Sequence, residues 1–226
     1  MRAWDVATLM TATVLRAGTG RRVIDAARRP PALLDLYEFE ACPFCRRVRE
    51  ALSALDLPAM IHPCPKGGRL RAFVREKGGK EQFPYLVDSS AGVAMYESTD
   101  IVRYLVETYG GTAPSSWLGP LSILSGSLAS SVRMHGRRTR PARRADKPLV
   151  LYGYEPSAYC RLVREVLCEL ELEYHLINVA RGSRERDAFV KRSGKMMVPY
   201  LADPNTEREM FESADIVRYL VDTYAA

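Results

Sequence analysis

Two cysteines separated by two residues, Cys42 and Cys45, are the side chains of this sequence best suited to chemistry. They follow a short apolar run that reads as a buried strand, and they open a segment with helical periodicity. Cys42 is therefore expected at a helix N-terminus, where unpaired backbone N–H groups and the helix dipole stabilise a thiolate. Cys45, one turn later, is placed to attack a mixed disulfide and release its product. The spacing predicts thiol redox chemistry.

The alternatives for this pair are a metal site or two inert thiols. Zinc normally takes a second pair of ligands, and no further CxxC or HxxxH pair is present in this half of the chain, so we expect no metal here. The charged neighbours act on the thiol in opposite directions, because arginines lower its pKa and glutamates raise it. These neighbours are Arg46, Arg47, Arg49, Glu38 and Glu40.

Two prolines at the start of apolar runs form a second feature, in Phe83-Pro84 and Val198-Pro199. A central strand accepts proline poorly, because proline cannot donate to the strand ladder. A cis bond at these positions would expose the backbone of Phe83 and Val198 to an extended peptide ligand. The alternative is a proline on an edge strand.

Glu97-Ser98 and Glu212-Ser213 each precede a segment with helical periodicity. A helix N-terminus that carries a hydroxyl is suited to binding a carboxylate of a ligand. The simpler interpretation is that Ser98 is an ordinary N-cap. Lys80 precedes the first proline run and could meet a second carboxylate, although a lone lysine is weak support.

The chain is an internal duplication. Residues 37–109 align with residues 152–224 at a constant offset of 115, with 31 identities over 73 positions and no gap. A turn-rich segment at 110–116 separates the two copies. Each copy also follows a helix-like stretch and a basic connector. The predicted organisation is a helix and basic connector at 1–32, a first domain at 33–112, a helix and Arg-rich linker at 113–147, and a second domain at 148–226.

Within each copy the hydrophobic pattern predicts the order βαβαββα. In the first copy the expected elements are strands at 33–39, 59–62, 83–88 and 93–96 and helices at 43–55, 69–77 and 98–109. In the second copy the clearest elements are a strand at 150–154 and helices at 159–170 and 212–224.

Each copy resembles a glutaredoxin, and equally the N-terminal thioredoxin-like domain of glutathione transferases, over residues 34–109 and 149–224. The resemblance implies an α/β fold with two tandem thioredoxin-like domains and glutathione as co-substrate. It implies that Cys42 is the nucleophile and Cys45 the resolving thiol. It also implies that Pro84, Glu97 and Ser98 line the glutathione site.

The second copy departs from this pattern. Ser157 stands in the place of Cys42, so Ser157-Ala-Tyr-Cys160 lacks the exposed nucleophilic thiol. Cys160 is expected to be structural, whereas Ser157 could stabilise a bound thiolate. The second domain is therefore interpreted as a degenerate binding or packing copy. Glutathione conjugation is disfavoured, because no all-helical domain follows either copy.

The net charge of +6 comes from the connectors. Residues 133–147 alone carry a net +6. Such a run could bind an anionic surface or be a solvated linker, and no specific nucleic acid is expected. Five cysteines without a secretory leader favour a reducing cytoplasm or organelle. No apolar run is long enough for a transmembrane helix.

The sequence therefore predicts a glutathione-linked thiol–disulfide oxidoreductase whose substrate is a disulfide or a glutathionylated thiol. The alternatives are a non-catalytic module that binds glutathione or a partner, with iron–sulfur ligation as a minor variant, and thirdly a glutathione transferase. The oligomeric state is left open.

Overall fold

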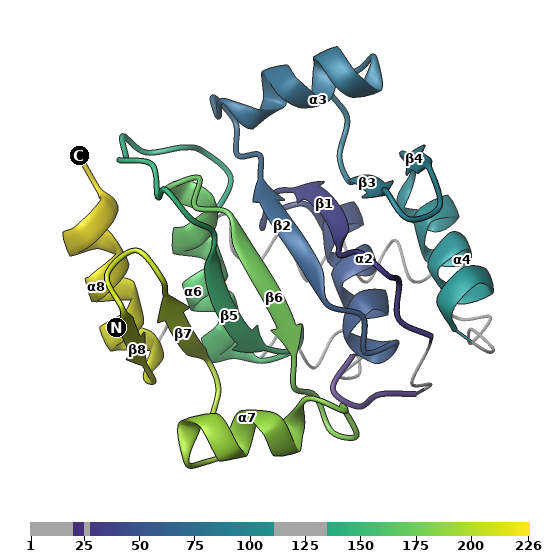
Figure 1. Ribbon diagram of the computed structural model, residues 1–226. Helices are drawn as coiled ribbons and strands as arrows, with labels where there is room; N and C mark the ends of the chain where they lie inside the picture. Colours follow the sequence, from purple (N-terminus) through teal and green to yellow (C-terminus); the bar gives the residue numbers. More distant parts are fainter. Residues whose placement is uncertain (1–19, 25–27, 111–134) are drawn as a thin grey trace.

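Within the residues that the structure describes, each half of the chain forms four strands and three helices in the order βαβαββα (Figure 1). The computed structural model describes residues 20–24, 28–110 and 135–226. The first unit consists of β1 Leu34–Glu38, α2 Pro43–Ala54, β2 Ala59–Pro63, α3 Leu70–Gly78, β3 Tyr85–Asp88, β4 Val93–Met95 and α4 Ser98–Tyr109. The second consists of β5 Leu149–Gly153, α6 Ala158–Glu169, β6 Tyr174–Asn178, α7 Arg186–Ser193, β7 Tyr200–Asp203, β8 Arg208–Met210 and α8 Ser213–Tyr224. The predicted α/β architecture with two tandem thioredoxin-like units is confirmed.

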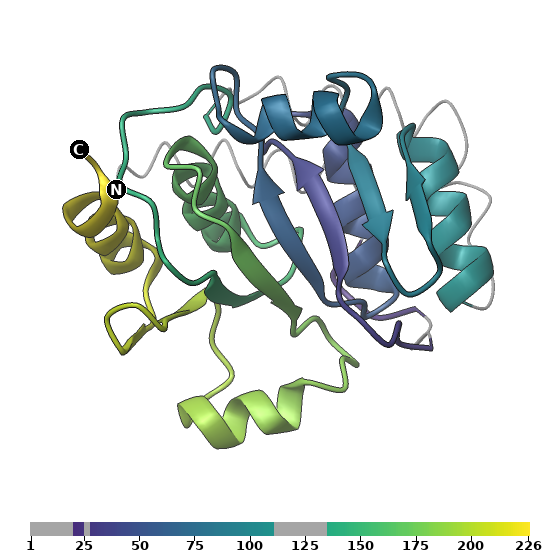
Figure 2. The same cartoon turned by 45° about the horizontal axis from the view of Figure 1, so that its top comes forward.

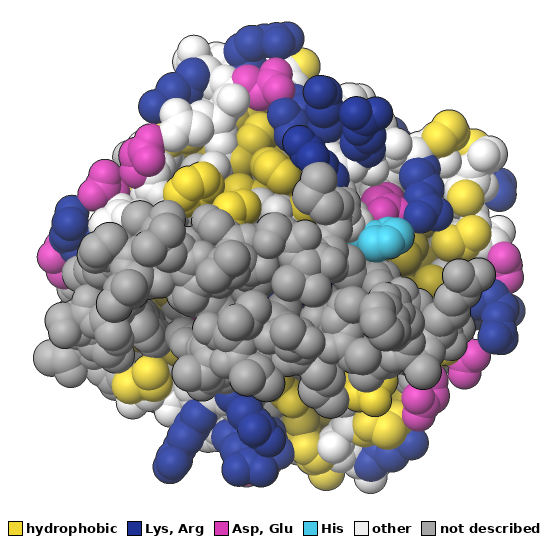
Figure 3. Space-filling model, turned by 180° about the vertical axis from the view of Figure 1, so that it is seen from behind, with side chains coloured by type: hydrophobic (Ala, Val, Ile, Leu, Met, Phe, Trp, Pro, Cys, Tyr) yellow, Lys and Arg dark blue, Asp and Glu magenta, His cyan; other side chains and the backbone are white. Residues whose placement is uncertain are grey.

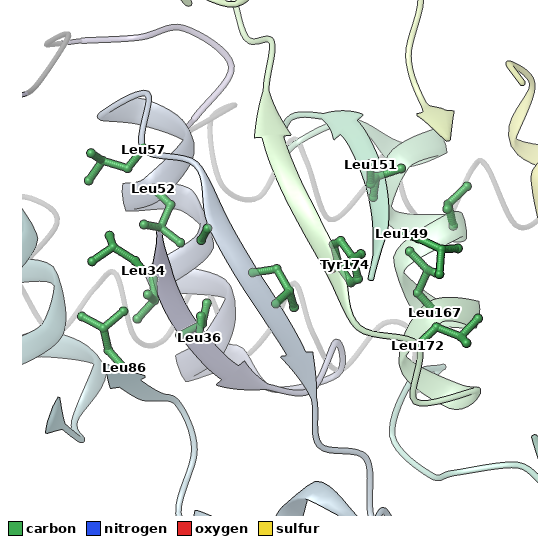
Figure 4. Close-up of a cluster of buried hydrophobic side chains, with 14 of the residues drawn as sticks. Leu34, Leu36, Leu52, Leu57, Leu86, Leu149, Leu151, Leu167, Leu172 and Tyr174 are labelled. Carbon is green, nitrogen blue, oxygen red and sulfur yellow. The ribbon is translucent and has the colours of Figure 1, made fainter. Parts of the chain in front are cut away.

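The core of each unit lies between the sheet and the helices that follow its first and last strands. In the first unit Leu34 and Leu36 are two residues apart in β1 and therefore lie on the same face of the strand, toward Leu52 of α2. All three side chains are almost fully buried (Figure 4). In the second unit the equivalent residues of β5, Leu149 and Leu151, are likewise buried in the core. The helices α3 and α7 cover the opposite face of the sheet, where tyrosine side chains pack against them.

The two units share one eight-stranded sheet, with strand order β4-β3-β1-β2-β6-β5-β7-β8 (Figures 1 and 2). They join through antiparallel pairing of β2 with β6. At the centre of this pairing Met60 lies opposite His175, and these two residues are equivalent positions of the repeat. The units are therefore related by a pseudo-two-fold axis through this pair, as in an isologous dimer.

Each basic connector lies against the opposite unit. The connector at Arg22 bridges Arg181 of the second unit, where the Val23 N–H donates to the Arg181 carbonyl at 2.8 Å. The connector at Arg138 bridges Lys66 of the first unit in the same way. The helices predicted ahead of both connectors, and Arg133, lie outside the described residues.

Several arginines of the second connector are exposed, and one of them, Arg140, pairs with Glu169 at 2.5 Å. Figure 3 shows the molecule from behind relative to Figure 1, and Lys and Arg side chains on this side form several separate groups. Within the described residues, no helix combines the length and the apolarity needed to cross a membrane.

A buried cluster of charges ties the units together. The Arg49 Nε atom lies 2.9 Å from Glu155, and its Nη2 atom lies 3.3 Å from Glu40. Arg164, the equivalent of Arg49, lies 3.0 Å from both Glu40 and Glu155. Glu38 adds a further ion pair to Arg49. All five side chains are almost completely excluded from solvent, so each charge depends on its partners.

Candidate active site

Cys42 is the N-cap residue of α2, as predicted from its place between a strand and a helix. Its backbone is extended, with φ −80° and ψ 120°, and its Sγ atom accepts the Cys45 N–H at 3.2 Å. A hydrogen bond from the Cys45 thiol and the backbone N–H groups of Cys45 and Phe44 lower the pKa of Cys42. Burial and the Glu38 carboxylate oppose this shift. The local geometry thus favours a thiolate at Cys42.

The exposure of the two thiols differs from expectation. Cys42 was expected to be an exposed nucleophile, yet only 3% of it is accessible. Cys45 is fully buried, and burial raises its pKa well above the usual range. Phe44, between them, is exposed.

The arginines of α2 do not act on Cys42 as the sequence suggested. Arg49 is neutralised by the glutamates of the buried cluster, and Arg46 pairs with Glu50 at 3.2 Å. Arg47 turns toward α4, where its Nη1 atom donates to the Ser98 hydroxyl at 2.9 Å. The largest effect on the pKa of Cys42 comes from a hydrogen bond with Cys45, which lowers it.

The bonds Phe83–Pro84 and Val198–Pro199 are both cis. Pro84 immediately precedes β3, which lies between β4 and β1, so the alternative of an edge strand is wrong. The ring of Phe83 meets the ring of Phe39 edge-on, with centroids 6.0 Å apart. Because Phe39 belongs to the segment that leads into Cys42, the cis-proline flanks the cysteine pair.

Helix α4 begins at Ser98, one residue earlier than it would if Ser98 were the N-cap, so the N-cap interpretation of Ser98 is wrong. Glu97 occupies the N-cap position with a φ of 65°, a left-handed conformation that non-glycine residues adopt rarely, and the Gln82 amide donates to its carboxylate. Ser98 is buried and held by Arg47. This arrangement places a guanidinium group at the helix N-terminus, where a ligand carboxylate would bind.

The second unit repeats the backbone of this corner without the arginine. Glu212 has a φ of 66° and α8 begins at Ser213. Leu162, however, stands in the place of Arg47. The lysines beside both corners are engaged with aromatic rings, since the Lys80 Nζ atom lies 4.6 Å from the centre of the Tyr96 ring. Lys195 and Phe211 repeat that contact.

At the start of α6 the structure places Ser157 where the first unit has Cys42. Its Oγ atom accepts the Cys160 N–H at 3.3 Å, so it caps the helix as Cys42 does. Cys160 is fully buried, and burial raises its pKa. Gly153 replaces Glu38, and a Cβ atom there would lie 2.9 Å from the Cys160 sulfur. The start of α6 therefore has neither a thiol of lowered pKa nor a counterpart of the Glu38 carboxylate.

Replacing Ser157 with Ala should lower the free energy of unfolding by about 1 kcal/mol, because the backbone N–H of Cys160 loses its side-chain acceptor. Urea denaturation followed by circular dichroism measures this loss. Ser157→Asn, which retains an acceptor, is the matched control and should lose much less. Equal losses in the two variants would contradict a capping role.

The sequence did not indicate the part played by Arg71. Its guanidinium lies 5.4 Å from the centre of the Phe39 ring and 4.8 Å from that of Phe83, and it pairs with Glu81 at 2.7 Å. It thereby fixes both rings that flank the cysteine pair.

A cavity of about 380 Å³ between α6 and α8 is lined by none of the predicted site residues. Across the described ranges, no group of three or more His, Cys, Asp or Glu side chains is arranged to hold a metal ion.

The family model described as "Glutathione S-transferase, N-terminal domain" matches this chain twice, at residues 36–113 and 151–226. Searches of curated proteins and of solved structures find no match. The two matched stretches coincide with the two units of the sheet and together cover more than half of the chain. The chain belongs to the glutathione S-transferase N-terminal domain family and contains two copies of that domain.

Proposed function

We propose that this protein is a glutathione-linked thiol–disulfide oxidoreductase whose reaction takes place at Cys42. The observation that carries the proposal is the geometry of Cys42, which accepts the Cys45 N–H at the start of α2 beside the cis-proline Pro84. Hydrogen bonds lower the pKa of Cys42, whereas burial raises that of Cys45. The two thiols are thus differentiated as an attacking and a resolving thiol require.

In the proposed reaction the Cys42 thiolate attacks the glutathione sulfur of a mixed disulfide. The Cys42–glutathione disulfide forms, and the substrate thiolate leaves and takes up a proton. Cys45, after losing its proton, then attacks Cys42 and releases glutathione, which leaves a Cys42–Cys45 disulfide. Two further glutathione molecules reduce this bond and depart as glutathione disulfide. Alternatively, one glutathione attacks the first intermediate directly.

Glutathione would lie along the cis-proline corner of the first unit. The backbone at Phe83, which precedes Pro84, would pair with the peptide, and Glu97 would meet its amino group. The start of α4 at Ser98, with the Arg47 guanidinium beside it, suits the carboxylate of the γ-glutamyl group. The second unit has Leu162 at the position of Arg47 and Ser157 at that of Cys42, and we assign it a non-catalytic role.

The 3% exposure of Cys42 favours a second candidate, a module that binds glutathione or a partner without turnover. The two candidates differ in whether Cys42 is used. The experiment is reduction of a peptide–glutathione mixed disulfide by the full chain in the presence of glutathione. We expect Cys42→Ser to reduce the rate to that of glutathione alone, because the nucleophile is removed while Ser157 shows that serine caps this helix position.

Cys160→Ser is the matched control in the second unit and should leave the rate unchanged. Cys45→Ser separates the two routes, since it blocks only the internal disulfide. If the natural chain reduces the substrate no faster than Cys42→Ser does while it still binds glutathione, the non-catalytic module is the correct function.

A further inference from the structure

The second unit contains a cavity of about 290 Å³ whose lining is strongly basic. It lies where the polypeptide leaves β5 and beside the cis bond that precedes Pro199. The lining combines three arginines with a tyrosine and a short apolar segment: Arg21, Arg181, Arg186, Tyr154, Met196, Met197 and Val198.

Backbone pairing holds two of these arginines next to each other. The Arg181 N–H donates to the Arg21 carbonyl at 3.1 Å, and the Val23 N–H donates to the Arg181 carbonyl at 2.8 Å. Arg186 opens α7, and its Nη1 atom donates to the Val179 carbonyl at 2.9 Å. The first connector and the second unit together therefore build the cavity.

Among the described residues, no carboxylate forms an ion pair with an arginine of this cavity, Arg21, Arg181 or Arg186. All three arginines act on the Tyr154 hydroxyl, since each of them lowers its pKa, although burial is the larger effect and raises it overall. Three uncompensated positive charges around one phenol repel one another, and a bound anion would relieve this repulsion.

In the first unit, the arginine equivalent to Arg186 already has an acidic partner and aromatic neighbours. There Arg71, the equivalent of Arg186, pairs with Glu81 at 2.7 Å and stacks on the rings of Phe39 and Phe83. In the second unit, Met196 replaces Glu81 and Val198 replaces Phe83. The substitutions remove both the acid and the ring that would occupy the arginine.

We propose that this cavity of the second unit binds a compact dianion through a phosphoryl group, either inorganic phosphate or a small phosphomonoester. Guanidinium groups donate paired hydrogen bonds to the oxygens of such a group, and the Tyr154 hydroxyl supplies another donor. A phosphoryl group carries nearly two negative charges at neutral pH, which suits three arginines better than a single carboxylate does. The inference goes beyond the proposed function and does not depend on it.

The test is isothermal titration calorimetry of the full chain with inorganic phosphate at pH 7.5 and low salt. We expect saturable binding of one phosphate per chain. Met196→Glu reproduces the acid of the first unit and should weaken binding by at least about tenfold, as should Arg186→Gln. Arg71→Gln, the equivalent change in the first unit, should leave phosphate affinity unchanged. Should Met196→Glu fail to fold, the exposed Arg181→Gln takes its place.

A parallel titration with glycerol phosphate separates the two sources, because a site for phosphomonoesters binds it more tightly than inorganic phosphate. Absence of phosphate binding, or equal affinity in the natural chain and the Met196→Glu variant, would show the proposal to be wrong. Displacement of phosphate by glutathione would assign the cavity to a peptide carboxylate and would also overturn it. These titrations need no turnover, so their outcome is independent of the reaction at Cys42.

Discussion

Replacing Arg164 with Met will lower the free energy of unfolding by about 3–5 kcal/mol, because Glu40 and Glu155 would keep buried charges without a counterion that lies 3.0 Å from each of them. Both carboxylates are almost fully buried, so water cannot take the place of the lost guanidinium group. Urea denaturation measures the loss, and Arg164→Lys gives a milder variant if the Met variant does not fold.

The control for this prediction is Arg218→Met. Arg218 pairs with Asp215 at 3.3 Å, but both side chains are largely exposed, so the loss should stay within about 0.5 kcal/mol. The double variant Glu40→Gln with Arg164→Met should lose less than Arg164→Met alone, since it also removes a buried negative charge. A loss for Arg164→Met as small as that for Arg218→Met would contradict the role of the cluster.

We expect the same cluster to make the two units unfold as one cooperative structure. Arg49 of the first unit reaches Glu155 of the second, and Arg164 reaches back to Glu40. Removing either arginine therefore takes a counterion away from buried carboxylates in both units. Hydrogen exchange should show that the strands of both units lose protection together in Arg164→Met, although the substitution lies in α6.

The repeat made the fold of each unit predictable from the sequence. Hydrophobic periodicity within 73 aligned residues gave the order of strands and helices, and α4 has the bounds that were expected. The cis bond at each proline was one of two interpretations that the sequence left open, the other being a proline on an edge strand. These features depend on neighbours close in the chain.

The joint between the units could not be predicted in this way. Arg49 and Glu40 look like ordinary charges at the start of a polar helix, and their partners Glu155 and Arg164 are more than 100 residues away. One signal was present, since arginine and glutamate recur at these positions in both copies. That recurrence indicates a shared contact, but only the pairing of β2 with β6 shows that each copy supplies the partner of the other.

Glu38 breaks the symmetry of the cluster, because its equivalent in the second unit is Gly153. Around the joint, five buried glutamates therefore face four buried arginines: Glu38, Glu40, Glu50, Glu155, Glu165, Arg46, Arg49, Arg161 and Arg164. Burial, together with the charges of Glu40 and Glu155, raises the pKa of Glu38 to about 7, although Arg49 opposes the shift. Near neutral pH the cluster takes up or releases one proton at Glu38.

This proton makes the stability of the protein depend on pH in a defined interval. Between pH about 4.5 and about 7 the folded chain holds a proton on Glu38 that the unfolded chain has lost, so the free energy of unfolding falls as pH rises. The fall amounts to ~3 kcal/mol and ends above the folded pKa. Glu40, whose pKa is lowered to about 2, acts in the opposite sense and only below pH about 4.5.

Glu38→Gln removes this proton, and we expect the variant to lose that fall. Relative to the natural chain, its free energy of unfolding should rise by ~3 kcal/mol between pH 4.5 and pH 8. Urea denaturation at several pH values measures the difference, in which the titration of His62 cancels because both chains contain it. Glu40→Gln is the comparison variant: it keeps the Glu38 carboxylate, and because it removes only the part of the Glu38 shift that the Glu40 charge causes, its rise in this interval should be smaller.

The same substitution should alter the reactivity of Cys42. The Glu38 carboxylate raises the pKa of both Cys42 and Cys45, so a neutral amide in its place lowers the pH at which the Cys42 thiolate forms. The rate of alkylation against pH should therefore have its midpoint at lower pH in Glu38→Gln than in the natural chain. If the two midpoints coincide, Glu38 acts on the stability of the joint alone, and the protonation of the charge cluster is not coupled to the thiol of the first unit.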